Sequence, residues 1–216
     1  MAELKFEGVD KRYRRKAVLS GVSHVFTPGL TLLVGPSGAG KTTLLRLAAT
    51  AEKPSGGRIL WDDAPLPASR TALRRTLGYA PQAVDLPEDL TAREFAMHIG
   101  ALKGLDLAAA DRQFGDITDR IGLHADINNR IATFSGGMRR RLILAHAMLG
   151  DPKLLALDEP TAELDRDTAG KVGELILERA AGAVVIMTTH LADDLAPQAA
   201  AVLRIENGVA ALEARA

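Results

Sequence analysis

The chain contains no cysteine, few aromatic residues, no net charge and no long apolar segment. Without a single Cys among its 216 residues it can form no disulfide, no thiolate metal site and no redox-active thiol pair. No apolar run approaches the ~18 residues needed to span a bilayer, and residues 1–5 are too charged for a signal peptide. These absences predict a soluble, cytoplasmic chain.

The charge balance limits the kinds of partner. Lys plus Arg and Asp plus Glu both number 27, so no overall charge attracts the chain to nucleic acid or to acidic membranes. The local basic clusters at 11–16 and 139–141 are typical of solvated faces, and we expect no nucleic-acid partner. With 47% hydrophobic residues, the chain can bury a sizeable core, and its length fits one domain with lobes.

A phosphate-binding pattern occupies residues 35–43 and fits G-x-x-x-x-G-K-S/T throughout. An apolar, β-prone run at 30–34 precedes it and a helix-forming run at 44–49 follows, which is the context the pattern needs. Glycines bring backbone N–H groups up to the phosphates, Lys41 would reach the β- and γ-phosphates, and the Thr42 hydroxyl would ligate Mg²⁺. The predicted nucleotide-binding residues here are Gly35, Pro36, Ser37, Gly38, Ala39, Gly40, Lys41, Thr42 and Thr43.

A second possible anion-binding feature begins at Ser135. Ser135, Gly136 and Gly137 open a predicted helix at 138–149; serine is a good N-cap, and the glycines leave backbone N–H groups open to an anion. Alone, this pattern is most often an ordinary capped helix. With a phosphate loop in the same chain, either one chain binds two nucleotides or two chains share one nucleotide.

Together these motifs resemble the ATP-binding-cassette (ABC) ATPases, whose signature motif reads Leu-Ser-Gly-Gly-Gln. The resemblance covers nearly the whole chain. It implies a Mg²⁺-dependent ATPase in which ATP, held by residues 35–43 of one subunit, is closed over by residues 135–137 of a second. Residues 89–95 and 135–142 look like those of bacterial export-type ATPases.

The resemblance also assigns a role to the carboxylates that end the apolar run 153–157. Strand alternation predicts that Asp158 and Glu159 point to opposite sides, so they should have different roles. Asp158 would support Mg²⁺ through water. Glu159 would orient and deprotonate the attacking water, as a general base.

Four further residues match the family pattern. Gln82 would contact Mg²⁺ and the γ-phosphate side, and His190 would touch the γ-phosphate, which completes a catalytic set with Lys41 and Glu159. Tyr13 resembles the aromatic residue that stacks on adenine. The loop ending in Asp165 would contact the opposite subunit.

Three residues depart from the family pattern. Met138 replaces the usual signature Gln and removes one polar contact to the nucleotide, although the export-type branch often carries Met there. Glu163 stands where Gly or Ala is more usual and puts a negative charge near the dimer interface. His146 replaces an Arg that is often seen, and we interpret it as structural.

The predicted fold class is α/β. We expect a P-loop NTPase (RecA-like) domain over residues 1–216, with a mainly parallel core sheet. Alternation at 3–27 and the run 57–61 predict an N-terminal antiparallel β-lobe. Helix-rich sequence from about 90 to 149 matches the helical subdomain that the family inserts, here at about 83–152.

The partners follow from the resemblance. We expect a second ABC ATPase subunit and an integral-membrane permease that contacts residues 83–88, with the chain peripheral on the inner face of the membrane. The principal alternative is a soluble, non-transport ABC ATPase of the iron–sulfur-assembly type. A nucleic-acid- or ribosome-acting ABC protein usually needs two cassettes or a long insertion, and a P-loop kinase would not need residues 135–137, Asp165 and His190.

Overall fold

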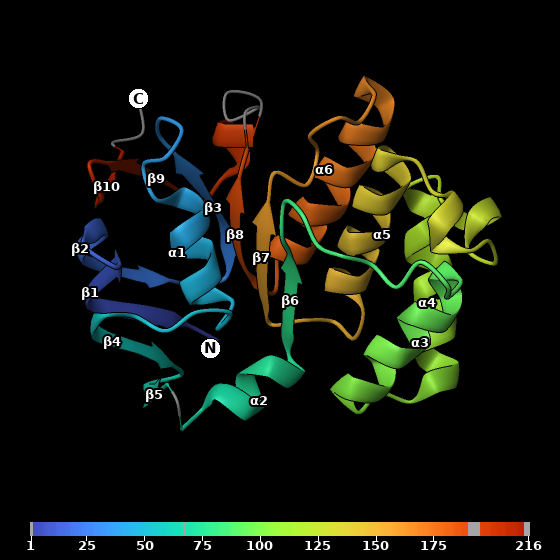
Figure 1. Cartoon of the computed structure of the whole chain (residues 1–216), viewed down its shortest axis with the longest axis horizontal. Helices are drawn as coiled ribbons and strands as arrows, with labels where there is room; N and C mark the ends of the chain where they lie inside the picture. The colour runs from blue at the N-terminus through green and yellow to red at the C-terminus, as the bar shows by residue number, and fades with distance from the viewer. Residues whose placement is uncertain (1, 67, 190–194, 214–216) are drawn as a thin grey trace.

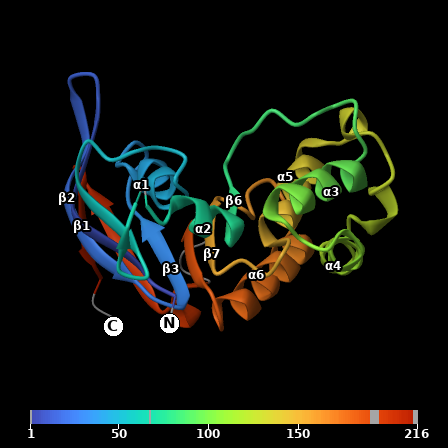
Figure 2. The ribbon, with the colours of Figure 1, turned by 90° about the horizontal axis from the view of Figure 1, so that it is seen from below.

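Two β-sheets and a group of helices follow one another along the longest axis of the molecule (Figure 1). The computed structural model describes residues 2–66, 68–189 and 195–213. The antiparallel sheet lies at one end, the parallel sheet in the middle and helices α3, α4 and α5 at the other end, as the second view also shows (Figure 2).

The antiparallel sheet has the strand order β2-β1-β4-β5. Its strands are β1 (Leu4–Tyr13), β2 (Lys16–Phe26), β4 (Gly56–Trp61) and β5 (Ala64–Pro65). Leu4 pairs with Phe26 on one side and Trp61 on the other, and all three side chains are buried. The alternation of apolar residues therefore places one face of this sheet in the core, and the predicted N-terminal β-lobe is confirmed.

The second sheet has the order β10-β9-β3-β8-β7-β6 and is parallel except for the pair β9–β10. Its strands are β3 (Gly29–Val34), β6 (Leu77–Ala80), β7 (Leu154–Asp158), β8 (Val184–Thr188), β9 (Ala201–Glu206) and β10 (Val209–Leu212). Strands β7 and β8 are buried on both faces, as expected for continuous apolar runs. The mainly parallel core sheet is thus confirmed.

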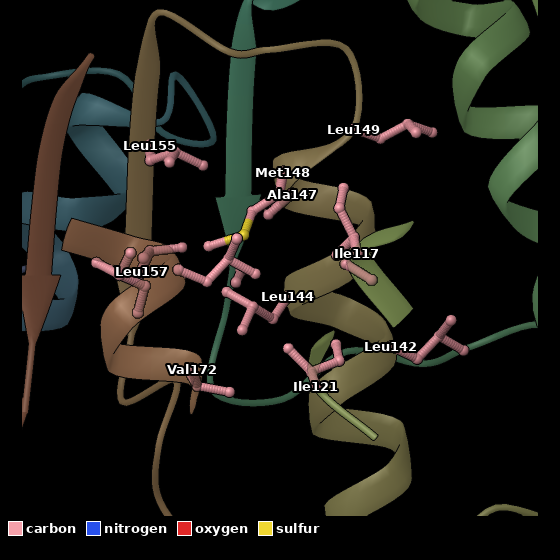
Figure 3. Close-up of a cluster of buried hydrophobic side chains, with 14 of the residues drawn as sticks. Ile117, Ile121, Leu142, Leu144, Ala147, Met148, Leu149, Leu155, Leu157 and Val172 are labelled. Carbon is pink, nitrogen blue, oxygen red and sulfur yellow. The ribbon is translucent and has the colours of Figure 1, made fainter. Parts of the chain in front are cut away.

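Each face of the parallel sheet has its own hydrophobic cluster. Leu154 and Ala156 of β7 join α1 (Lys41–Ala48) and the antiparallel sheet, whereas Leu155 and Leu157 join α5 and α6 on the opposite face. Figure 3 shows this second cluster, with α6 (Arg166–Ala180) and α5 (Gly136–Met148) meeting β7. Helix α1 is therefore held between the two sheets, where it presents its N-terminus at one edge.

The segment between β6 and β7 contains three α-helices, as predicted for the insertion. They are α3 (Ala92–Lys103), α4 (Leu107–Arg120) and α5, and their N-caps are Thr91, Asp106 and Ser135. The described residues also include α2 (Arg70–Arg75) and short 3₁₀ turns at His124–Asp126, Ile131–Thr133 and Ala196–Gln198. Within the described residues, no helix has the length and apolar character to cross a membrane.

His146 lies in the core of the helical layer. Its ring stacks on Phe114 at 5.7 Å and meets the edge of Phe95 at 4.6 Å, and Nε2 has no hydrogen-bond partner among the described residues. Burial, with a smaller contribution from the nearby Lys103 ammonium and against a hydrogen bond to the Ala92 backbone, lowers the pKa of His146 to about 3. The neutral ring packs as an aromatic core residue, in keeping with the structural role predicted for it.

We expect His146 to make folding sensitive to mild acid. Because its pKa is about 3 when folded and near 6.5 when unfolded, the unfolded chain binds more protons between these values. Its contribution is therefore complete above pH 6.5 and falls by roughly 1.4 kcal/mol per unit as pH decreases. Urea unfolding at pH 7 and pH 5 should show that His146→Leu loses about 2 kcal/mol less than wild type over this range.

The exposed His98 provides the control, because His98→Leu makes the same chemical change on the surface of α3. His98→Leu should lose as much stability between pH 7 and pH 5 as wild type. Parallel losses for wild type and His146→Leu would contradict this assignment.

Candidate active site

The loop between β3 and α1 takes a conformation that only particular residues allow. Gly35 has φ +136°, and a Cβ there would lie 2.1 Å from the Ile205 carbonyl oxygen. Gly40, the N-cap of α1, has φ +113°. The chain therefore turns directly into a helix whose first N–H groups point out of its N-terminus, an arrangement that binds phosphate. Lys41 Nζ lies over the loop and donates to the carbonyls of Gly35 at 2.7 Å and Pro36 at 3.0 Å.

This loop forms one wall of a cleft of about 300 Å³. The other wall consists of the carboxyl ends of β6 and β7, which meet at the same edge of the parallel sheet as β3. The lining residues are Val18, Ser37, Gly38, Gly40, Lys41, Thr42, Thr43, Gln82, Asp158 and Glu159. The fold thus brings Gln82 and the two carboxylates to the phosphate loop, as the sequence predicted.

The two carboxylate oxygens of Asp158 have different surroundings, and one of them is suited to bind a cation. Asp158 is buried at the end of β7, and its Oδ1 accepts a 2.6 Å hydrogen bond from the Thr188 hydroxyl. Its Oδ2 is buried without a hydrogen-bond partner among the described residues. Such an atom is costly to bury unless a ligand satisfies it. Among the described residues, no group of three or more His, Cys, Asp or Glu side chains is placed to hold a metal ion.

Glu159 does not point to the side opposite Asp158, as strand alternation predicted, because both residues line the same cleft. Strand β7 ends at Asp158, and Glu159 adopts φ +51°, which turns the chain sharply. Its backbone N–H donates to the carbonyl and hydroxyl oxygens of Thr188, at 3.1 and 3.0 Å. The Glu159 carboxylate then accepts from Gln82 Nε2 at 3.4 Å inside the cleft. Two adjacent carboxylates thus enter one cleft with different surroundings.

The second predicted phosphate-binding element lies elsewhere on the surface. Ser135 caps α5 by accepting the Met138 N–H at 3.3 Å, and Ser135 and Gly136 are exposed, outside the wall of the cleft. The Met138 side chain is partly buried and packs against the core cluster. The exposed N-terminus of α5 is therefore accessible to a ligand held by another molecule.

Tyr13 occupies the end of β1, where it pairs with Lys16 across the β1–β2 turn. Its hydroxyl donates to Glu52 at 2.6 Å, and Lys11 Nζ lies 5.0 Å from the centre of its ring. A second cavity of about 350 Å³ runs from Lys16 along the phosphate loop to Asn207. Tyr13 is beside this cavity in the hairpin but does not line it, so stacking on adenine stays a prediction.

Two predicted site residues remain, Asp165 and His190. Asp165 is the N-cap of α6 and accepts the Thr168 N–H at 3.0 Å. These hydrogen bonds from Thr168 lower the pKa of the Asp165 carboxyl, so it stays ionised at the surface. His190 lies outside the described residues.

Thr188 is not among the predicted site residues, although it forms hydrogen bonds with both Asp158 and Glu159. It ends the apolar run 184–188, and β8 pairs with β7 in parallel, Thr188 opposite Asp158. A polar residue at the end of a buried run neighbouring the carboxylate strand was the signal that could have revealed it.

The fold and the cleft define a P-loop nucleotide-binding α/β protein. The chain itself belongs to the ABC transporter family, because the sequence model of that family matches residues 19–162, more than half of its length.

Two curated relatives support this membership. The chain is 34% identical over 198 residues to the Nod factor export ATP-binding protein I of Rhizobium etli, covering 90% of this chain and 62% of the relative. It is 35% identical over 206 residues to the uncharacterized ABC transporter ATP-binding protein YxlF of Bacillus subtilis, covering 95% of this chain and 68% of that protein. The chain thus spans somewhat less than two-thirds of the Rhizobium protein.

Solved structures share the fold. An ATP-binding subunit of an ABC transporter superposes with a TM-score of 0.89 at 26% identity, covering 97% of this chain and 89% of that one. The ATP-binding cassette MJ0796, in a dimeric post-hydrolysis state bound to ADP and Pi, superposes with a TM-score of 0.87 at 24% identity, covering 97% of both chains. At 24% identity, the likeness to MJ0796 concerns the fold alone.

Proposed function

We propose that the chain is an ATP-hydrolysing, nucleotide-binding subunit that powers a separate membrane permease. The observation that carries this proposal is the cleft in which Lys41 of the phosphate loop faces Asp158, Glu159 and Gln82. A phosphate-binding loop alone suits any nucleotide-binding protein. Asp158, a buried carboxylate with one oxygen that lacks a hydrogen-bond partner among the described residues, and the neighbouring Glu159 carboxylate supply what hydrolysis also requires.

Each residue of the cleft has a separate role in ATP hydrolysis. The loop N–H groups and Lys41 bind the triphosphate, and Thr42, Gln82 and Asp158 would hold Mg²⁺, which when bound neutralises charge on the β- and γ-phosphates. Glu159 accepts a proton from water, whose oxygen bonds to the γ-phosphorus as the bond to the ADP oxygen breaks. Gln82 orients the Glu159 carboxylate. The products are ADP and phosphate.

The exposed start of α5 supports a shared site between two chains. In this arrangement, residues 135–137 of one chain close over the ATP held by residues 35–43 of the other, so ATP stabilises the closed pair because it contacts both. The cassette MJ0796, which shares the fold, has been solved as a dimer with ADP and Pi. Residues 1–216 act as one ABC ATPase domain, with residues 83–152 as its helical subdomain.

The permease assignment rests on the relatives. The Rhizobium protein is named for Nod factor export and the Bacillus protein as a transporter ATP-binding protein. The chain would lie in the cytoplasm on the inner face of the membrane, with the loop after Gln82 in contact with the permease. This loop, which crosses from β6 to α3 (Figures 1 and 2), is largely exposed between Gln82 and Asp85.

Phosphate release by the purified chain tests the enzymatic part. We expect Mg²⁺-dependent release of phosphate from ATP that EDTA abolishes, and Lys41→Met should reduce it at least ~100-fold because the lysine contacts the transferring group. Lys171→Met removes the same charge from the exposed surface of α6 and should leave the rate unchanged. Equal rates for wild type and Lys41→Met would contradict the proposal.

A pull-down from gently solubilised native membranes tests the partner. Recovery of a polytopic protein that lacks its own cassette would support the transporter role. Recovery with cytosolic proteins alone, and absence from the membrane fraction, would contradict it and favour the non-transport ABC ATPase.

A further inference from the structure

The Glu159 peptide is held in an unfavourable conformation. Its φ of +51° lies in the left-handed region, which non-glycine residues seldom adopt because it strains the backbone. Thr188 holds the peptide from one side by accepting the Glu159 N–H. On the carbonyl side, the Ala162 N–H of the same turn donates to the Glu159 oxygen at 3.1 Å.

A further contact to this carbonyl comes from Arg140 of α5, outside the turn. Its Nη1 donates to the Glu159 carbonyl oxygen at 3.1 Å, and its Nη2 donates to Glu163 Oε1 at 3.3 Å. The Arg140 side chain is only 15% exposed. Glu163 also has positive φ, +63°, so the guanidinium spans the turn that begins at one strained residue and ends at the other.

We propose that Arg140 is a positioning residue for ATP hydrolysis: it fixes the Glu159 peptide so that the Glu159 carboxylate meets Gln82 in the cleft. This inference rests on the proposed function. Arg140 itself does not line the cleft, so it acts through Glu159 and not on the nucleotide held there. It also attaches the helix that starts at Ser135 to the general base of the same chain.

The chemistry of arginine suits this role. The planar guanidinium carries donors on separate nitrogens and can reach the Glu159 carbonyl and the Glu163 carboxylate at once. A lysine ammonium is a compact point charge that can replace one of these contacts more easily than both. Since Glu163 is 69% exposed, its ion pair with Arg140 is worth little, and the bond to the carbonyl is the important one.

Steady-state ATPase kinetics of Arg140→Met test the proposal. Loss of the hydrogen bond from Arg140 to the Glu159 carbonyl should displace the Glu159 carboxylate and lower kcat about 10- to 100-fold. The KM for ATP should stay within about twofold, since the phosphate loop is untouched. Arg140→Lys should recover at least part of kcat, because one donor can still reach the carbonyl. Arg140→Gln, with one shorter donor, gives a second comparison if methionine lowers the unfolding midpoint.

Arg120 offers a matched control. It also joins the helical layer to the core, through two 2.8 Å bonds from α4 to Glu178 of α6, but it does not contact Glu159. Arg120→Met should therefore keep the wild-type kcat. An unchanged kcat in Arg140→Met, or an equal loss in Arg120→Met, would overturn the inference while wild-type hydrolysis remained intact. A wild-type chain that releases no phosphate would instead contradict the proposed function, and this inference with it.

Discussion

Glu159→Gln is expected to abolish ATP hydrolysis while leaving ATP binding intact. Glutamine keeps the size and the hydrogen-bonding oxygen of the side chain but cannot accept a proton from water, so kcat should fall by about 10²–10⁴-fold. The loop carbonyls that bind Lys41 and the buried Asp158 are not altered. ATP that binds but is not cleaved keeps two chains together, so the variant should accumulate as an ATP-dependent dimer.

Light scattering after size-exclusion chromatography, with and without Mg-ATP, measures this outcome alongside phosphate release. Glu174→Gln makes the same change at an exposed position of α6 and should hydrolyse ATP and return to monomer as wild type does. A Glu159→Gln chain that stays monomeric in saturating Mg-ATP would contradict the shared site. Retained hydrolysis would show that another group is the base.

Gly78→Ala is expected to have the largest effect on stability. A Cβ at Gly78 of β6 would lie 1.9 Å from the Ala147 carbonyl oxygen of α5 and 2.6 Å from Leu155 Cδ2. The nearest atom, the Ala147 oxygen, belongs to a helix backbone, which cannot rotate away as a side chain can. Strand β6 and α5 must therefore separate, at a cost of about 3 kcal/mol or more.

The urea unfolding midpoint measures this effect, and Gly170→Ala is its control. Gly170 lies in α6 with nothing within 4 Å of an added Cβ, so alanine there should stabilise the helix by about 0.5–1 kcal/mol. Equal midpoints for Gly78→Ala and wild type would mean that the helix moves freely over β6. Loss of ATPase activity together with loss of stability is expected, because β6 leads directly to Gln82.

The sequence revealed those parts of the cleft that are contiguous in the chain. The phosphate loop needs particular residues at fixed spacing, so the pattern at 35–43 was sufficient to place Lys41 and Thr42. Asp158 was recognisable because it ends an apolar strand. The alternation of strands and helices in the C-terminal part predicted the mainly parallel core sheet, and β7 and β8 are buried on both faces.

Other features depend on contacts between distant segments. The left-handed turn at Glu159 replaced the simple alternation expected of a strand, and its supports, Thr188 and Arg140, come from β8 and α5. Nothing in the basic run 139–141 separates Arg140 from its neighbours. Arg139 donates to Glu88 and Arg141 to the Gly122 carbonyl, so three consecutive arginines have three different partners.

Because Gly78 of β6 lies against the backbone of α5 at Ala147, any tilt of α5 would pivot about its C-terminal end. Its C-terminal end is fixed against β6 through Ala147, while its N-terminal end carries Ser135, so over 13 residues the arm is about 20 Å long. A tilt of only about 5° around the fixed end would displace the Ser135 end by roughly 2 Å. Arg140 lies along this arm, 3.1 Å from the Glu159 carbonyl, so such a tilt changes that hydrogen bond too. A force applied at the exposed tip of the helix would thereby reach Glu159, the proposed general base of the same chain.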